Sequence, residues 1–293
     1  MSNPIVAARI QTAPGRVHSD AAWGVILVIP YIVVFVFVVV YPILYGFKLG
    51  ANAESYRKLF QDPIYLKSAW NTLVFLIIAV NLKLLIALFL SGFFYNTETW
   101  IRWVGILFLL PWAAPSLPAI FSIRWMFNSE WGLINGILFR LFGIDGPLWL
   151  VKPDLAFGLV IATHIWKNLP FWTLILLAGR MAIPKDHYEA ANVDGATRFQ
   201  AFRFITFPGI KNLYITSTLL STIWSVGDFN SVYLLTGGGP WDSTHVLSTL
   251  GIRYAFNIGD IPTGVATVIT ALPLVIPIVM ILIRRLGKGE RNG

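Results

Sequence analysis

Long apolar runs separated by short polar segments dominate the chain. A helix that crosses the hydrocarbon core of a bilayer needs about 20 mostly apolar residues. Six runs approach or exceed this length, over about 22–47, 71–94, 103–124, 155–178, 212–235 and 262–283. A helix satisfies its own backbone hydrogen bonds in lipid. The pattern therefore predicts an all-α, polytopic membrane protein with six transmembrane helices.

Prolines interrupt three of these runs. They are Pro30 and Pro42 in the first run, Pro111, Pro115 and Pro118 in the third, and Pro273 and Pro277 in the sixth. Kinked helices are tolerated in a membrane where neighbouring helices re-satisfy the freed carbonyls. We therefore expect a packed bundle, with residues 1–293 forming a single transmembrane domain.

Composition and charge support lipid as the solvent of this chain. Hydrophobic residues make up 56% and charged residues 12%, whereas a soluble domain carries about 25% charged residues. The formal net charge is +8, but the basic residues lie between apolar runs and form no continuous stripe, which argues against a nucleic-acid partner. The chain has no cysteine, so it has neither a disulfide nor a thiol nucleophile.

Lys and Arg predict the orientation, because they accumulate in the cytoplasmic loops of membrane proteins. With the N-terminus in the cytoplasm, the inner segments carry twelve basic residues and the outer segments seven. We therefore expect both termini in the cytoplasm and residues 1–21 as a cytoplasmic tail, not a cleaved signal peptide. The outer segment 125–154 has apolar residues at helical spacing (Trp131, Ile134, Leu138 and Phe142), which predicts either a short interfacial helix or an irregular loop.

The inner segment 179–211 has the pattern of a helix, a turn and a second helix. Pro184 suits the first position of a helix, and Gly195 can end it in the left-handed conformation. Two successive alanines make the first helix slim enough to enter a groove on another protein, and Glu189 can pair with a partner's arginine. These residues alone fit either a docking helix or a connector that lies on the membrane.

The same segment resembles the EAA signature of the membrane subunits of ABC importers. The matching positions are Glu189, Ala190, Ala191, Asp194, Gly195, Ala196, Phe202, Ile205, Thr206 and Pro208. The run Leu234-Leu235-Thr236-Gly237-Gly238-Gly239-Pro240 and the segments Asn71-Thr72-Leu73 and Trp149-Leu150 also resemble the binding-protein-dependent sugar permeases, of the type of the maltose importer's larger membrane subunit. The resemblance extends over about 22–285.

The resemblance implies a type I ABC importer permease fold in the bacterial inner membrane. In that family this loop is a coupling helix seated on a cytoplasmic ATPase, so the implied ATPase-coupling residues are Glu189, Ala190, Ala191, Asp194 and Gly195. The implied partners are two ATPase subunits, a second permease subunit in a heterodimer, a periplasmic solute-binding protein and a sugar. The chain has no G-x-x-x-x-G-K-[ST] loop. We therefore expect ATP and Mg on the ATPase, and no cofactor, metal or catalytic residue in this chain.

Two polar stripes lie inside the apolar runs. They are His164, Lys167, Asn168 and Phe171 in the fourth run, and Ser221, Trp224, Ser225 and Asp228 in the fifth, each on one helical face. Ionisable residues inside a membrane are costly and indicate a functional site by default. Because both stripes lie near the middle of their runs, we expect them to line one cavity. The family's sugar site uses the same two helices, so the resemblance implies a substrate pathway here.

The charges in these stripes depart from the neutral residues that the family has there. His164 and Lys167 favour an anionic sugar, such as a uronate oligosaccharide, for example an alginate fragment, or a sugar phosphate. The structural alternative is an ion pair between Lys167 and Asp228 that stabilises the bundle, and the two roles are compatible.

Two other classes of protein explain less of the sequence. A stand-alone secondary transporter or channel would use the same charges for proton coupling, but it leaves the pattern of 179–211 unexplained. A membrane-embedded enzyme would need a constellation such as H-E-x-x-H or G-x-S-x-G, which the runs lack.

Two further features have a structural explanation first. Lys83, in the second run, is expected to face another helix or a partner subunit. Gly237 to Gly239, before Pro240, most simply make a tight turn, and contact with a periplasmic binding protein is the alternative.

Overall fold

The structure of the chain is a computed structural model that describes residues 17–96 and 98–290. The described residues form helices and no strands, which confirms the predicted all-α class. Residues 1–16 of the predicted N-terminal tail lie outside them. The chain divides into two units, residues 1–49 and 50–293, and each is described by itself.

The first unit is a long apolar helix. It runs through α1 (Val17–Phe35), a π-helical stretch η1 (Val36–Val40) and α2 (Tyr41–Gly50), and Pro30 lies inside it. Over Trp23–Gly50 the mean hydropathy is 2.9 and none of the apolar window is buried. A helix that is apolar on all sides is typical of a membrane span.

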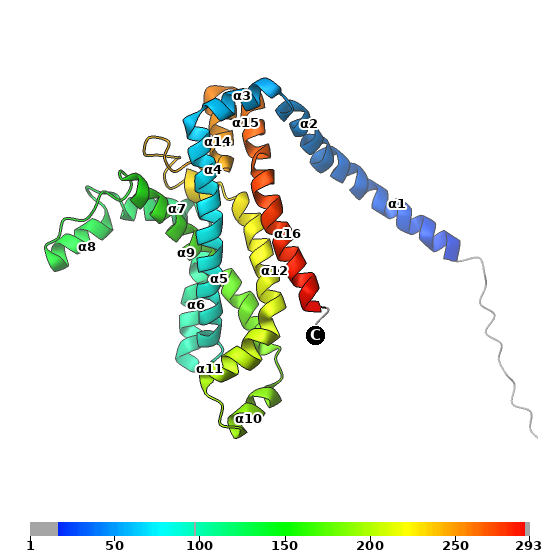
Figure 1. Ribbon diagram of the computed structural model, residues 1–293, viewed down its shortest axis with the longest axis vertical. Coiled ribbons are helices and arrows are strands. Elements are labelled where there is room, and N and C mark those ends of the chain that lie inside the picture. The colour runs from blue at the N-terminus through cyan, green and yellow to red at the C-terminus, as the bar shows by residue number, and fades with distance from the viewer. Residues whose placement is uncertain (1–16, 97, 291–293) are drawn as a thin grey trace, which may run out of the picture. The chain divides into compact units, whose positions relative to one another are not determined.

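The second unit is a helical bundle with short helices at both ends (Figure 1). Its first half comprises α3 (Ala53–Gln61), α4 (Pro63–Phe75), η2 (Leu76–Val80), α5 (Asn81–Phe94), α6 (Thr99–Ala113), α7 (Ser116–Met126), α8 (Leu133–Phe142) and α9 (Pro153–Met181). Its second half comprises α10 (Lys185–Val193), α11 (Arg198–Ala201), η3 (Phe202–Thr206), α12 (Phe207–Val226), α13 (Asn230–Tyr233), α14 (Leu247–Ile252), η4 (Arg253–Ile258), α15 (Ile261–Ile269) and α16 (Ala271–Glu290). Figure 1 shows α10 and α11 at one end of the bundle and α3, α14 and α15 at the other.

The 29-residue helix α9 is the centre of this bundle and packs against α5, α6 and α12. Trp172 and Leu176 of α9 are fully buried against Leu84 of α5 and Ile210 of α12. Helix association in lipid depends on close packing more than on the hydrophobic effect. Buried, interlocking side chains on α9 therefore fix the positions of the helices around it.

Small residues bring two helices into contact near one end of the bundle. A Cβ added to Gly264 of α15 would lie 2.6 Å from the carbonyl oxygen of Gly251 of α14. Only glycine permits this approach, which is the packing that membrane helices favour.

Four helices in the described residues are long and apolar enough to cross a membrane, over Trp23–Gly50, Pro63–Phe94, Pro153–Met181 and Ile261–Leu286. The predicted third run, 103–124, is not one straight helix, because α6 and α7 meet at an angle of 99° and make a fifth span only if counted together. Pro115 precedes the first residue of α7 and cannot continue the hydrogen bonding of α6.

The predicted fifth run, 212–235, also differs in shape from a single helix. Its helix α12 begins earlier, at Phe207, and ends at Val226, and the short α13 follows after a break at Gly227. α12 carries many hydroxyl side chains, among them Ser217, Ser221 and Ser225, which lower its mean hydropathy. A sixth span over this run stays a prediction.

The segment 125–154 forms a helix, as one of the two alternatives predicted. α8 covers Leu133–Phe142, and Gly143 ends it in the left-handed conformation with a φ of 65°. Its large apolar side chains, such as Phe139 and Leu141, are exposed. An exposed apolar helix of this length suits a membrane interface.

Candidate functional site

A cavity of about 440 Å³ lies where α9 meets the end of α12. All the predicted pathway residues except Phe171 line this central cavity: His164, Lys167, Asn168, Ser221, Trp224, Ser225 and Asp228. Lys83 of α5 and the corner between α6 and α7 complete its wall. The structure thus brings the two polar stripes together around one space.

A chain of polar contacts crosses one wall of the central cavity. The Nζ of Lys83 lies 2.8 Å from Nε2 of His164, and Nδ1 of His164 lies 2.5 Å from Oδ2 of Asp228. Ser225 reaches the same Nε2 at 3.3 Å. These contacts join α5, α9 and the break after α12 through side chains that are almost entirely buried.

With Lys83 as an ammonium, the contacts of His164 assign its proton to one ring nitrogen. A lysine ammonium only donates hydrogen bonds, so Nε2 of His164 must accept from Lys83. The proton then resides on Nδ1, which donates to the carboxylate of Asp228. The imidazole is therefore neutral in this arrangement and relays polarisation between a buried cation and a buried anion.

Asp228 lies in the break between α12 and α13, where it can accept hydrogen bonds from Ser231. The backbone N–H of Ser231 donates to Oδ1 of Asp228 at 3.1 Å, and the Ser231 hydroxyl donates to Oδ2 at 2.5 Å. The carboxylate thus accepts from His164 and twice from Ser231. These charge-assisted bonds offset the desolvation of the buried anion.

Lys167 does not pair with Asp228, so the alternative prediction of a stabilising ion pair between these two residues is wrong. Its ammonium donates to the carbonyl of Pro111 at 2.7 Å and also to the carbonyl of Ala114. A helix leaves its last carbonyls without intrahelical partners, and a lysine there is favourable. Lys167 therefore satisfies the C-terminal end of α6 at the 99° corner, where Pro115 ends the hydrogen-bond ladder.

The charges that line the central cavity do not cancel. Lys83 and Lys167 are positive, and Asp228 is the only carboxylate among the lining residues. With His164 neutral, the lining carries one excess positive charge. A buried charge is costly unless it is compensated, so the cavity favours an anionic occupant over a cationic one.

Aromatic rings also line the central cavity. Trp112, Trp172 and Trp224 line it, whereas Phe171 is not among the lining residues. The ring of Phe171 stacks instead on Trp112 at 5.6 Å and lies 5.5 Å from Trp224. Phe171 therefore holds the rings that face the cavity.

The predicted coupling residues lie on and just after α10. Glu189 and Ala190 are exposed, and Val193 has 88% of its surface accessible. On another face of the helix, the Tyr188 hydroxyl bonds Thr206 at 2.9 Å. α10 therefore has one face turned to the bundle and one without contacts in the described residues.

The end of α10 confirms the predicted turn. Ala191 lies near the end of the helix, Asp194 follows it, and Gly195 has a φ of 74° in the left-handed region. The N–H of Ala196 bonds the carbonyl of Ala191 at 2.9 Å. This closure satisfies a helix-terminal carbonyl and reverses the chain toward α11.

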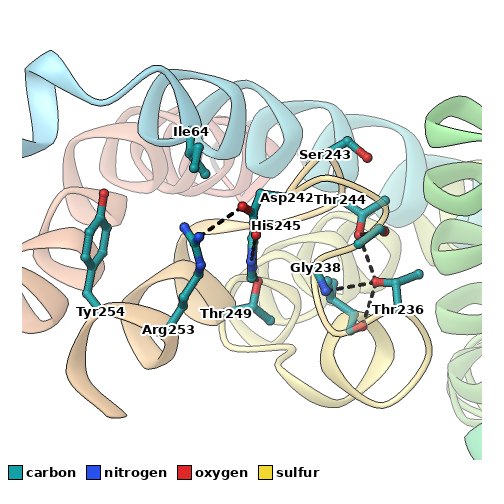
Figure 2. Close-up of polar contacts among 12 residues, drawn as sticks. Ile64, Thr236, Gly238, Asp242, Ser243, Thr244, His245, Thr249, Arg253 and Tyr254 are labelled. Atoms are coloured by element: carbon teal, nitrogen blue, oxygen red, sulfur yellow. Dashed lines mark hydrogen bonds and ion pairs between the residues drawn. The ribbon is translucent and has the colours of Figure 1, made fainter. Parts of the chain in front are cut away.

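The glycine run after α13 forms the predicted tight turn (Figure 2). Gly238 has a φ of 93°, and a Cβ there would lie 2.1 Å from the ring of His245. The hydroxyl of Thr236 accepts from the Gly238 N–H at 3.2 Å and bonds Thr244 at 2.8 Å. The Gly239–Pro240 bond is cis. The turn leaves Trp241 at its tip with 80% of its surface exposed.

An ionic cluster lies beside this turn (Figure 2). Asp242 contacts Arg253 at 3.0 Å and Nε2 of His245 at 3.3 Å. Burial lowers the pKa of His245, and this effect outweighs the attraction of Asp242. Nδ1 of His245 bonds the hydroxyl of Thr249 at 3.0 Å.

Hydrogen bonds tie the same turn to α4. The amide of Asn71 donates to the carbonyls of Ser243 at 2.7 Å and His245 at 3.0 Å. The hydroxyl of Thr72 accepts from the N–H of Leu247 at 2.9 Å. The two segments singled out by their resemblance to sugar permeases, around Asn71 and Gly238, therefore form one structural unit.

Sequence reasoning missed Lys83 as part of the central cavity. The expectation that it faces another helix is confirmed, but its contact is His164 of the polar stripe itself. A second lysine buried in an apolar run was the available signal. Ser231 and the carbonyls at the α6–α7 corner had no such signal, because their roles arise from where the helices break.

Comparison with known proteins agrees with this architecture. Residues 24–291 match the family of binding-protein-dependent transport system inner membrane components. The chain is 30% identical over 291 residues to the trehalose/maltose transport system permease protein MalF of Thermococcus litoralis, covering 94% of this chain and 97% of that one. It is 30% identical to the sulfoquinovosyl glycerol transport system permease protein SmoG of Agrobacterium fabrum, with 90% of each covered.

A solved structure shows the same fold. A chain in the crystal structure of a bacterial alginate ABC transporter, bound to a periplasmic protein with alginate pentasaccharide, superposes with a TM-score of 0.82. It covers 91% of this chain and 94% of that chain at 22% identity. The predicted type I ABC importer permease fold is therefore confirmed.

Proposed function

Because this chain belongs to the family of inner membrane components of binding-protein-dependent transport systems, we propose that it forms half of the translocation pathway of an ATP-driven importer for a sugar or oligosaccharide. The relatives named for trehalose/maltose and for sulfoquinovosyl glycerol support a sugar as the solute. The chain acts as a transport subunit and not as an enzyme.

The central cavity is the observation that carries this proposal. It combines flat indole faces with hydroxyl, amide and charged groups inside an otherwise apolar bundle. Sugars present apolar ring faces and a rim of hydroxyls, so Trp224 would stack on a ring while Asn168 and Ser221 bond hydroxyls. Its volume of about 440 Å³ falls within the range of about 300–1,000 Å³ that is usual for ligand pockets.

The excess positive charge narrows the solute to an acidic sugar. Asp228 is already engaged by His164 and Ser231, whereas Lys167 has only backbone carbonyls as acceptors in the described residues. A carboxylate or phosphate on the sugar would supply the missing counter-charge through charge-assisted bonds. A uronate oligosaccharide of the alginate kind or a sugar phosphate fits this requirement.

The partners follow from the two ends of the bundle. We place α10 in the cytoplasm, together with both chain termini, and seat its exposed face around Glu189 and Ala190 in an ATPase subunit. Val193 adds an exposed apolar contact there. A second permease subunit, as a heterodimer, would complete the pathway and bind the second ATPase. The exposed turn at Trp241 lies at the opposite end, where a periplasmic binding protein would deliver the sugar.

The charge argument is tested by a ratio of two transport rates. The complex that contains Lys167→Met is compared with wild type for uptake of an acidic oligosaccharide and of a neutral one of equal length. We expect acidic uptake to fall at least tenfold further than neutral uptake, since one charge-assisted bond is worth about 1.5–3 kcal/mol. Loss of the α6–α7 contact affects both solutes alike and cancels in the ratio.

The control is Lys152→Met, which removes a charge from an exposed position before α9. It should leave both rates unchanged. Equal loss of acidic and neutral uptake in Lys167→Met would refute an acidic solute while leaving a neutral sugar open.

Docking to an ATPase is tested by crosslinking, and the absence of native cysteine makes single-cysteine variants unambiguous. Ala190→Cys on the exposed face of α10 should crosslink to a nucleotide-hydrolysing subunit. Tyr188→Cys, on the half-buried face of α10 that contacts Thr206, should react much less. If Ala190→Cys reaches no ATPase, or labels only from the periplasmic side, the importer assignment of this loop fails.

A further inference from the structure

A second cavity, of about 860 Å³, lies between α10 and the bundle. We call it the α10 cavity. Its wall includes three basic side chains, Arg180 at the end of α9, Lys185 on α10 and Arg198 on α11. Tyr95 and Tyr188 also belong to its lining. The cavity is separate from the central cavity and shares no lining residue with it.

The basic side chains of the α10 cavity have no acidic partner. The residues that line it include neither Asp nor Glu. In the part of the chain that the structure describes, none of the ion pairs involves Arg180, Lys185 or Arg198. The carboxylate of Glu98 accepts from the indole N–H of Trp100 at 2.5 Å and is not part of the lining. Three positive charges around one space repel each other and favour an anion between them.

The guanidinium of Arg180 has a hydrogen-bond donor without a partner. Its guanidinium is half-buried, and Nη2 donates to the carbonyl of Leu88 at 3.3 Å. Its Nε is buried and has no hydrogen-bond partner. A buried donor without an acceptor costs about 1–3 kcal/mol, and the side chain of Arg180 also lines the α10 cavity. The planar fork of arginine matches phosphate oxygens in particular.

The cavity opens beside a belt of exposed aromatic residues. Phe93 and Trp100 belong to its lining and are exposed, and Trp103 continues the exposed row one turn further along α6. Tryptophan concentrates at the level of lipid headgroups. A ligand that carries phosphate could therefore enter either from the bilayer surface or from the aqueous phase.

We propose that the α10 cavity binds a phosphate-bearing anion, which is the headgroup of an anionic lipid or a free phosphate compound. The anion accepts from Arg180 and Arg198, with the hydroxyls of Tyr95 and Tyr188 as further donors. It bridges the end of α9 to α10 and α11, so its occupancy sets how firmly α10 is held against the bundle. The proposal does not rest on the nature of the transported solute.

The test measures binding of two probes to the full-length chain, purified with the subunits that accompany it. One arm uses nanodiscs of phosphatidylcholine with increasing phosphatidylglycerol and counts the phosphatidylglycerol retained in native mass spectra. The other arm uses phosphatidylcholine alone and follows the thermal midpoint as inorganic phosphate is added. Binding in the first arm identifies a lipid headgroup, and binding in the second identifies a free phosphate.

Variants decide whether the binding occurs in this cavity. Arg198→Gln should weaken binding of the preferred probe about tenfold, the effect of 1.4 kcal/mol. Arg180→Gln should weaken it further. Arg203→Gln is the matched control, because Arg203 lies on the same segment but outside the cavity. It should bind as wild type does.

Folding failure does not obscure the result. Arg180→Gln also removes the bond to Leu88, but Arg198 is exposed at the start of α11 and leaves the Thr197–Gln200 capping box intact. Arg198→Gln is therefore the deciding variant. If wild type and Arg198→Gln bind both probes equally, or if Arg203→Gln weakens binding as much, the α10 cavity is not an anion site.

Discussion

The contact chain from Lys83 through His164 to Asp228 makes a sharp prediction for Asp228→Asn. Asparagine has the same shape but one acceptor oxygen and one donor amide in place of two acceptors. The amide oxygen at the Oδ2 position keeps the bonds from Nδ1–H of His164 and from the Ser231 hydroxyl, but the amide nitrogen at the Oδ1 position then faces the N–H of Ser231, which is also a donor. The substitution also removes the negative charge that compensates the buried ammonium of Lys83, which His164 links to Asp228. Asp228→Asn therefore leaves one backbone donor unpaired and one buried cation uncompensated.

The expected loss of stability follows from the burial of these groups. The side chains of His164 and Asp228 are 4% and 14% exposed, so solvent cannot replace the lost partner. Removal of one member of a buried charged set destabilises by about 3–5 kcal/mol, because the remaining charge is left uncompensated. Asp228→Asn should therefore reduce the free energy of unfolding by this amount in reversible SDS titration in mixed micelles.

The matched control is Asp154→Asn, which makes the same chemical change at an exposed position in the first turn of α9. It should lose less than about 1 kcal/mol, the value of one charge near a helix end. The double variant with Lys83→Met removes the stranded cation. It should be more stable than the sum of the single effects predicts, by about 0.5–3 kcal/mol. Strict additivity, or equal losses in Asp228→Asn and Asp154→Asn, would refute the coupling of Lys83 to Asp228 through His164.

The remaining predictions concern the turn after α13. Gly238→Ala should destabilise well beyond Gly259→Ala, because both have positive φ but only a Cβ at Gly238 meets the ring of His245; equal thermal midpoints would contradict the close approach. Asn71→Asp replaces the donor to Ser243 and His245 by an acceptor and should cost at least about 1–3 kcal/mol, the loss for one unsatisfied buried group, whereas a wild-type free energy of unfolding would contradict those bonds. Burial lowers the pKa of His245 in the folded chain. The contribution of His245 to stability is therefore full above its ordinary pKa of about 6.5 and is lost as pH falls through that value toward the folded pKa. His245→Gln should flatten this part of the curve of thermal midpoint against pH, and an unchanged slope would argue against the lowered pKa.

The sequence was sufficient to predict the helical class and the meeting of the two polar stripes. Period and depth determine which residues of two helices share a face, so His164 and Asp228 could be expected at one level before any contact was known. The left-handed Gly195 was equally predictable, because local backbone chemistry decides it.

Partners of the buried charges were not predictable in the same way. The distance between Lys167 and Asp228 depends on where α6 bends and α12 ends, which is set by Pro115 and Gly227 together with the packing around them. From the sequence alone, Lys83, Lys167 and His164 were all possible partners of the one carboxylate in these stripes, that of Asp228. The corner of α6 and α7 resolved that competition by supplying carbonyls to Lys167.

At the corner of α6 and α7, the side chain of Lys167 has two roles. The ammonium of Lys167 both faces the space that a solute would fill and fastens the end of α6 through the carbonyls of Pro111 and Ala114. An anion that drew this ammonium toward itself would have to take it from those carbonyls, since its three protons are shared among few acceptors. Binding of the solute would then itself release the α6–α7 corner, without a second group that detects the solute.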